Sequence, residues 1–172
     1  MTKIRKIIFV LVEGPTDKTA LSKILENILK ENTVYIYVEY GDITTRLQPP
    51  SSRETILSRL GERLSEFVER SHIRFSDILQ YIHIVDMDGA YIEDSDILYD
   101  EKATKTVYTL TSIVTDKVES IIARNVQKRA CINKLISTHS IRKIPYHIYF
   151  MSSNLDHILH NRTNLTDKDK IR

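Results

Sequence analysis

Near its start the chain reads Ile7-Ile8-Phe9-Val10-Leu11-Val12-Glu13-Gly14-Pro15-Thr16-Asp17-Lys18, and a later stretch reads Tyr81-Ile82-His83-Ile84-Val85-Asp86-Met87-Asp88-Gly89. Each stretch is an apolar, β-branched run that stops at acidic residues and a glycine. Such a run is typical of a buried strand in a parallel sheet, and the residues that follow it lie at the carboxyl edge of that sheet. The sequence therefore predicts two strands that deliver carboxylates to a common edge, where they can form a divalent-cation site.

The size and composition of the chain are those of one globular domain. It has 172 residues, of which 41% are hydrophobic and 28% charged, and a net charge of +2 is too small to indicate a nucleic-acid-binding protein by bulk charge. The single cysteine, Cys131, cannot form an internal disulfide, and the sequence contains neither a signal peptide nor a run long enough to span a bilayer. We expect a single domain over 1–172, located in the cytoplasm and not in a membrane.

Strand-like and helix-like patterns alternate along the chain. Further strands are predicted at Val34 to Tyr40 and Tyr146 to Met151, and apolar residues at helical spacing follow Pro15 and Ser52 and recur around Leu155. This alternation predicts an α/β protein with a Rossmann-like, four-stranded parallel sheet flanked by helices. The connection between the third and fourth strands is longer than one crossover helix needs, which predicts a helical insertion at about 90–144.

The predicted insertion contains one amphipathic helix with two distinct sides. Its apolar side comprises Val114, Val118, Ile121, Ile122 and Val126. Lys117, Arg124 and Lys128 fall together on another side of the helical wheel, which predicts a basic ridge. Two interpretations stay open, a solvated helix face and a surface that binds the phosphate backbone of a nucleic acid.

Four carboxylates are expected near the crevice outside the carboxyl ends of the strands, namely Glu13, Asp17, Asp86 and Asp88. If the strand continues through Asp86 and Asp88, both side chains leave the same face and can share one cation. Carboxylates without nearby His or Cys favour Mg²⁺, with Mn²⁺ as a substitute. The alternative is that Asp-x-Asp-Gly forms an ordinary turn after a strand.

These two motifs, each at the end of a strand, resemble those of the Toprim domain, which is shared by topoisomerases, primases and the overcoming-lysogenization-defect (OLD) nucleases. The resemblance covers roughly residues 5–160 and implies Mg²⁺ dependence. It implies that Glu13 serves as general acid or base and that Asp86 and Asp88 bind the metal. Asp17 matches an additional acidic position of the nuclease branch, associated with a second cation, and Asp156 corresponds more loosely to another metal ligand.

Within that family the nuclease branch fits best, because 172 residues cannot also hold a strand-passage domain or the accessory modules of a primase. The resemblance implies a nuclease acting on nucleic acid, with DNA favoured over RNA, and suggests a role in phage defence or DNA repair. OLD-type nucleases couple this domain to an ATPase. No phosphate-cradling loop occurs here, so an ATPase partner would be a separate chain. Association of identical chains is left open.

Two other functions remain as alternatives. Residues 84–90 also resemble the nucleophile motif of haloacid-dehalogenase-type phosphatases, in which Asp86 would be phosphorylated and Asp88 would act as acid or base. The third candidate is a Toprim-like module that binds or assembles partners without catalysis. Nuclease activity, release of phosphate from a phosphomonoester, or the lack of both would distinguish the three functions.

Overall fold

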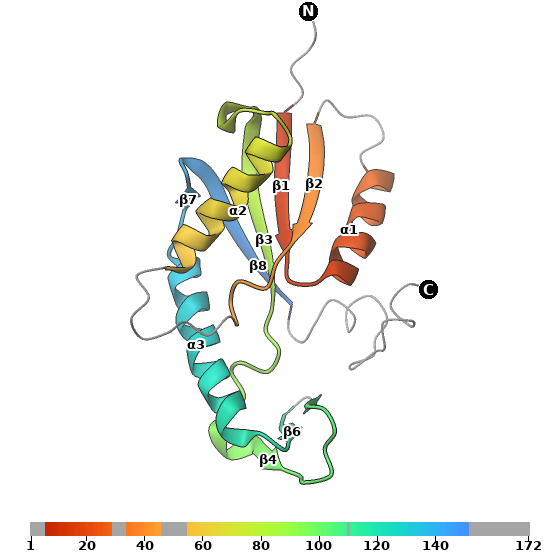
Figure 1. Ribbon diagram of the computed structural model, residues 1–172, viewed down its shortest axis with the longest axis vertical. Helices are drawn as coiled ribbons and strands as arrows, with labels where there is room; N and C mark the ends of the chain where they lie inside the picture. The colour runs from red at the N-terminus through yellow and green to blue at the C-terminus, as the bar shows by residue number, and fades with distance from the viewer. Residues whose placement is uncertain (1–5, 29–33, 46–54, 110, 152–172) are drawn as a thin grey trace, which may run out of the picture.

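The computed structural model describes residues 6–28, 34–45, 55–109 and 111–151. Its main sheet has five strands in the order β2-β1-β3-β8-β7 (Figure 1). They are β1 (Lys6–Val12), β2 (Val34–Tyr40), β3 (Ile78–Asp86), β7 (Ser140–Ile141) and β8 (Ile144–Met151). The neighbours from β2 to β8 run parallel, whereas β7 pairs antiparallel with β8 and forms one edge.

Helices cover both faces of the main sheet. They are α1 (Pro15–Ile28), α2 (Ile56–Arg70) and α3 (Val118–Ile136). On one face, Leu21 and Leu25 of α1 pack against a cluster that contains Val10 and Val12 of β1. Because successive strand residues point to opposite faces, the neighbouring Phe9 and Leu11 lie on the other face. They belong to a larger core with side chains from α2 and the end of α3.

The start of α2 shows why the helix begins where it does. Thr55 has extended backbone angles, its side chain accepts a hydrogen bond from the Ser58 backbone N–H, and the Ser58 hydroxyl accepts one from the Thr55 N–H. This reciprocal pair satisfies backbone donors that the first helical turn leaves without partners. The apolar stripe of α2 then buries Leu60, Leu64 and Phe67 in the larger core.

A second, smaller sheet lies between β3 and α3 in the sequence. It consists of β4 (Ile97–Tyr99), β5 (Val107–Tyr108) and β6 (Ile113–Thr115) in the order β4-β6-β5. Two 3-10 turns, η1 (Phe75–Asp77) and η2 (Asp94–Asp96), precede β3 and β4. In Figure 1, α3 runs from this small sheet at the lower end of the molecule up to the main sheet.

The prediction of an α/β protein with a mainly parallel sheet flanked by helices is confirmed. All four predicted strands are present, but the count of four is wrong because β7 adds a fifth strand. The region 90–144 is also not purely helical, since it contains the small sheet, and Val114 lies in β6 rather than in a helix. The helical pattern around Leu155 lies outside the described residues. None of the described helices combines the length and apolar character needed to cross a membrane.

Candidate active site

The strand order creates a crevice between β1 and β3. From β1 the chain passes through α1 to β2 on one side, and from β2 it returns through α2 to β3 on the other side of β1. The chain therefore leaves the carboxyl end of β1 toward β2 and the carboxyl end of β3 toward β8, in opposite directions, and open α/β sheets bind ligands at such a point. The pairing between β1 and β3 ends at Leu11 and His83, so Glu13 and Asp86 lie beyond it, although Asp86 still pairs with Met151 of β8.

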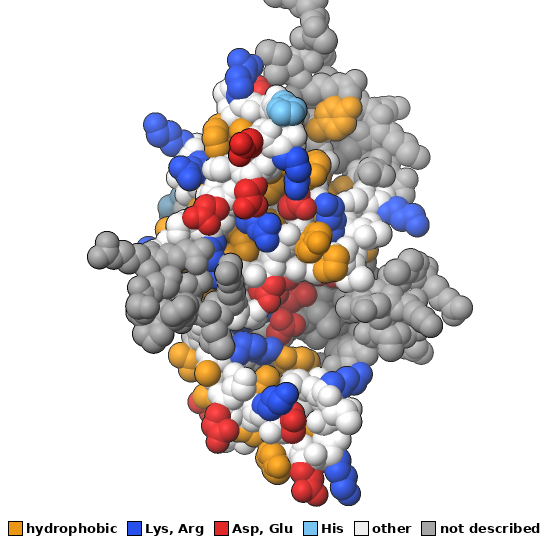
Figure 2. Space-filling view, viewed as in Figure 1, with side chains coloured by type: hydrophobic (Ala, Val, Ile, Leu, Met, Phe, Trp, Pro, Cys, Tyr) orange, Lys and Arg blue, Asp and Glu red, His pale blue; other side chains and the backbone are white. Residues whose placement is uncertain are grey.

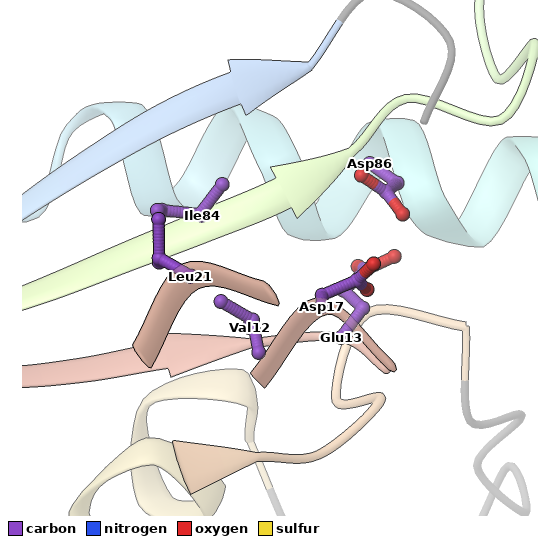
Figure 3. A pocket seen from close by; sticks show the side chains of 6 residues that line it. All are labelled: Val12, Glu13, Asp17, Leu21, Ile84 and Asp86. Atoms are coloured by element: carbon purple, nitrogen blue, oxygen red, sulfur yellow. The ribbon is translucent and has the colours of Figure 1, made fainter. Parts of the chain in front are cut away.

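A pocket at this point joins carboxylates from three elements. It is lined by Val12 and Glu13 at the end of β1, Asp17 and Leu21 of α1, and Ile84 and Asp86 of β3. Figure 3 shows the carboxyl group of Asp86 facing those of Glu13 and Asp17, with the three apolar side chains to their left. The predicted juxtaposition of Glu13 and Asp86, which are distant in sequence, is therefore present.

Asp17 is held close to the backbone by the first turn of α1. Its Oδ2 atom accepts a hydrogen bond of 3.0 Å from the Gly14 N–H, and the residue is 9% exposed. A Cβ atom at position 14 would lie only 2.7 Å from that oxygen, so glycine is what permits this close approach. Asp17 also lies at a helix N-terminus, where a negative charge is favourable. Gly14 is thus required because it lets the Asp17 carboxylate lie against the backbone.

Asp88 occupies a turn and does not continue the strand. β3 ends at Asp86, and the Ala90 N–H donates to the Met87 carbonyl across 2.8 Å. Asp88 and Gly89, at the centre of this turn, both have positive φ, with values of 44° and 65°. This is the backbone pattern of a type I′ turn, for which Asp-Gly is a preferred pair. The expected arrangement, with Asp86 and Asp88 leaving one face of a continuing strand, is therefore absent.

Lys128 of α3 lies inside the site rather than on a surface ridge. Its side chain is completely buried, and its Nζ atom lies 2.8 Å from Asp88 Oδ2 and 3.1 Å from Glu13 Oε2. Arg124 also turns inward and donates to the Asp88 carbonyl at 2.7 Å. Of the predicted basic ridge only Lys117 is exposed. The ridge is therefore wrong as a surface feature, because the buried stripe of α3 runs along that side of the helix.

Two further residues of the site carry no sequence signal. Thr44, which is fully buried, donates a hydrogen bond from its hydroxyl to Glu13 Oε1. Arg59 of α2 is also buried and donates to the carbonyl of Ile43 at 2.7 Å, which fixes the segment that carries Thr44. Glu13 is thus held at one oxygen by Thr44 and at the other by Lys128.

Burial changes the acidity of two of these carboxyl groups. Desolvation raises the pKa of Glu13 to about 6, although Lys128 and the hydrogen bond from Thr44 oppose it. The pKa of Asp86 rises to about 8, first through burial and then through repulsion from Asp17 and the other carboxylates. Burial opposes the charged form of Lys128, yet Glu13 and Asp88 raise its pKa, so it stays protonated.

The chemistry of the donors fits a hard divalent cation. Glu13, Asp17 and Asp86 provide only carboxylate oxygens, the ligands that Mg²⁺ and Mn²⁺ prefer. The pKa of Asp86 is raised because burial and the neighbouring carboxylates outweigh the opposing charge of Lys128. In the described part of the chain, no three His, Cys, Asp or Glu side chains are already arranged around a metal position, so binding would require these carboxylates to reorient. Asp156 lies outside the described residues.

Comparison of the chain with models of protein families, with curated proteins and with solved structures yields no match. A function must therefore be argued from the geometry of the site. Figure 2 shows acidic side chains gathered in a hollow at the middle of one face, with basic side chains directly below them. An acidic pocket beside positive charge is an arrangement that can hold a cation and receive a phosphate group.

Proposed function

We propose that this protein is a Mg²⁺-dependent nuclease that hydrolyses phosphodiester bonds, with Mn²⁺ able to replace Mg²⁺. The proposal rests on one observation: Glu13 and Asp86, from strands far apart in the sequence, line one pocket with Asp17. An all-carboxylate donor set at the carboxyl edge of a parallel sheet is suited to metal-assisted phosphoryl chemistry. The resemblance of the motifs to the Toprim domain of OLD-type nucleases supports the same reaction, and an ATPase partner stays a prediction from that resemblance.

Each residue of the pocket has a role in this proposal. Asp17 and Asp86 would hold the ion, with Glu13 beside them. A bound Mg²⁺ supplies positive charge at the phosphate and lowers the pKa of a coordinated water. Glu13 would accept or return a proton, because its pKa of about 6 lies close to neutral pH. Thr44 and Lys128 fix the orientation of the Glu13 carboxylate by holding one oxygen each.

The test is cleavage of supercoiled plasmid and of single-stranded DNA and RNA by the purified protein with MgCl₂, MnCl₂ or EDTA. We expect cleavage with either metal and none with EDTA. Glu13→Gln and Asp86→Asn should each lower the rate at least about 100-fold, because each removes a carboxylate on which the reaction depends. Glu69→Gln and Asp116→Asn make the same chemical changes at exposed positions and should retain the wild-type rate.

The same preparations distinguish the alternatives. Release of phosphate from p-nitrophenyl phosphate, lost in Asp86→Asn and without DNA or RNA cleavage, would indicate a phosphatase in which Asp86 is the nucleophile. Absence of both activities in a folded protein supplied with either metal would favour a binding or assembly module. Either result would reject the nuclease proposal.

A further inference from the structure

Lys128 is the unusual residue of this site. A lysine with no exposed side-chain surface is costly, since removing an ammonium group from water requires compensation by well-placed partners. Two partners are present here, because Nζ lies 2.8 Å from Asp88 Oδ2 and 3.1 Å from Glu13 Oε2. They come from the turn after β3 and the end of β1, so the ammonium group joins the two acidic motifs.

The ammonium group lies between carboxylates of the two strand-end motifs. A cation shared by the two strand-end motifs must contact a carboxylate from each motif, and the Lys128 ammonium group already does so. Its charge balances the Glu13 and Asp88 side of the cluster. Asp88 does not line the pocket, whereas Glu13, Asp17 and Asp86 do.

The two sides of the cluster therefore differ in what they can bind. On the side of Asp88, an additional divalent ion would have to displace or approach a fixed positive charge at close range, which is strongly unfavourable in a buried site. On the side of Asp17 and Asp86, carboxylates face one another, and the described residues that line the pocket include no lysine or arginine. Of these two sides, the second is therefore better suited to a metal ion.

We propose that the Lys128 ammonium group stands in for a second metal, so that the site binds a single divalent ion among Glu13, Asp17 and Asp86. This inference rests on the proposed metal-dependent function and specifies its stoichiometry. It differs from the expectation drawn from the resemblance, in which Asp86 and Asp88 bind one ion and Asp17 helps to bind a second. Asp88 is here a partner of Lys128 rather than a metal ligand.

The test counts bound Mn²⁺ by electron paramagnetic resonance of the free ion and by titration calorimetry, with MnCl₂ as the probe. We expect one Mn²⁺ per chain for the wild-type protein and two for Lys128→Met, because the pair Glu13 and Asp88 then lacks its counter-charge. Lys134→Met, an exposed position on the same helix, should still bind one. Asp88→Asn should also bind one Mn²⁺, whereas Asp86→Asn should bind none or bind at least about tenfold more weakly.

Circular dichroism establishes that each variant is folded before its ions are counted. If Lys128→Met does not fold without metal, wild type and Asp88→Asn still decide the matter. Two Mn²⁺ in the wild type, or loss of Mn²⁺ in Asp88→Asn, would overturn the inference and leave the nuclease proposal standing. A folded Lys128→Met protein that binds only one Mn²⁺ would also overturn it. A wild-type protein that binds no Mn²⁺ and cleaves nothing would reject the inference and the proposed function together.

Discussion

Single atoms at the first turn of α1 determine where one carboxylate points. Gly14 allows Asp17 Oδ2 to approach its backbone N–H, and any Cβ at position 14 would be 2.7 Å from that oxygen. A side chain at this position must therefore displace the Asp17 carboxylate, even though Gly14 itself does not have a positive φ. Glycine is needed here because it leaves room for the Asp17 carboxylate, and not because of a backbone conformation that only glycine adopts.

Gly14→Ala should weaken Mn²⁺ binding at least about tenfold and lower the free energy of unfolding by about 1–2 kcal/mol. Calorimetric titration with MnCl₂ and urea unfolding measure the two effects. Gly61→Ala is a matched control, because its new Cβ would meet only the flexible side chain of Arg142 and alanine favours the helix. Equal Mn²⁺ affinity in wild type and Gly14→Ala would show that Asp17 does not contact the ion.

His83 makes the stability of the fold sensitive to acid. It is fully buried, its Nδ1 atom shares a hydrogen bond of 2.9 Å with the Tyr146 hydroxyl, and burial lowers its pKa to about 3. The unfolded chain takes up this proton near pH 6.5, whereas the folded protein does so only near pH 3. Stability from this group is therefore present above pH 6.5 and is lost as the pH falls toward 3.

From this residue alone, the free energy of unfolding should fall by about 1.4 kcal/mol per pH unit between pH 6 and 4. Urea unfolding in EDTA at several pH values measures this slope. The double variant His83→Phe, Tyr146→Phe removes both hydrogen-bonding groups and should lose less stability over the same range. Tyr146→Phe alone retains the imidazole and should keep the steeper slope. Identical slopes in all three proteins would contradict the prediction.

At the scale of elements, a chain of contacts passes from α2 to the end of β1. Arg59 of α2 donates to the carbonyl of Ile43, and the adjacent Thr44 donates to Glu13. The position of α2 therefore affects the orientation of the Glu13 side chain through the segment after β2. This hydrogen bond also lowers the pKa of Glu13, against the larger effect of burial.

Thr44→Val keeps the shape of the side chain and removes its hydroxyl. If Glu13 is the proton acceptor of the proposed reaction, the acidic limb of the pH–rate profile should move to higher pH by about half a pH unit, because the ionised carboxylate loses a donor. Steady-state cleavage rates between pH 5 and 9 measure this movement. Thr19→Val makes the same change on an exposed part of α1 and should leave the profile where it is.

The strands that carry the site could be predicted, because β1, β2, β3 and β8 are long apolar runs that end in recognisable residues. The strands β4, β5, β6 and β7 have only two or three residues each, too few to show a period of two in the sequence. The buried environment of Lys128 could not be predicted for a different reason. It shares a stripe with Ile121, Asn125, Ile132 and Leu135, all buried, while Val126 of the expected apolar side is 52% exposed. Because Asn125 and Lys128 are polar, the sequence of this stripe does not show the apolar periodicity of a buried helix face. Thr44 belongs to no periodic pattern, so its place in the site could not be predicted either.

At the scale of the whole molecule, Arg124 connects the parts of the structure that meet at the site. It contacts the Tyr108 hydroxyl in the small sheet, lies 5.4 Å from the centre of the Tyr108 ring, and donates to the carbonyl of Asp88 after β3. One side chain of α3 therefore ties the small sheet to the turn that holds the partner of Lys128. The small sheet and the main sheet should be energetically coupled through this arginine.

Arg124→Met should destabilise the protein by about 2 kcal/mol, because it leaves partly buried acceptors without this donor. Amide hydrogen exchange should increase in the small sheet and in residues 87–90 while remaining slow in β1. Arg63→Met removes an exposed ion pair between neighbouring turns of α2 and should cost little. Unchanged exchange in the small sheet of the Arg124 variant would show that the two sheets are independent.

The contact between Glu13 and Lys128 joins residues that are 115 positions apart. During synthesis on the ribosome, the acidic residues of β1, α1 and β3 emerge well before the lysine of α3. At about 5–20 residues per second, the nascent chain spends seconds with these carboxylates and without the lysine that balances them. The half-made protein therefore cannot assemble this cluster of charges, and a chain that terminates early is left with the acids alone.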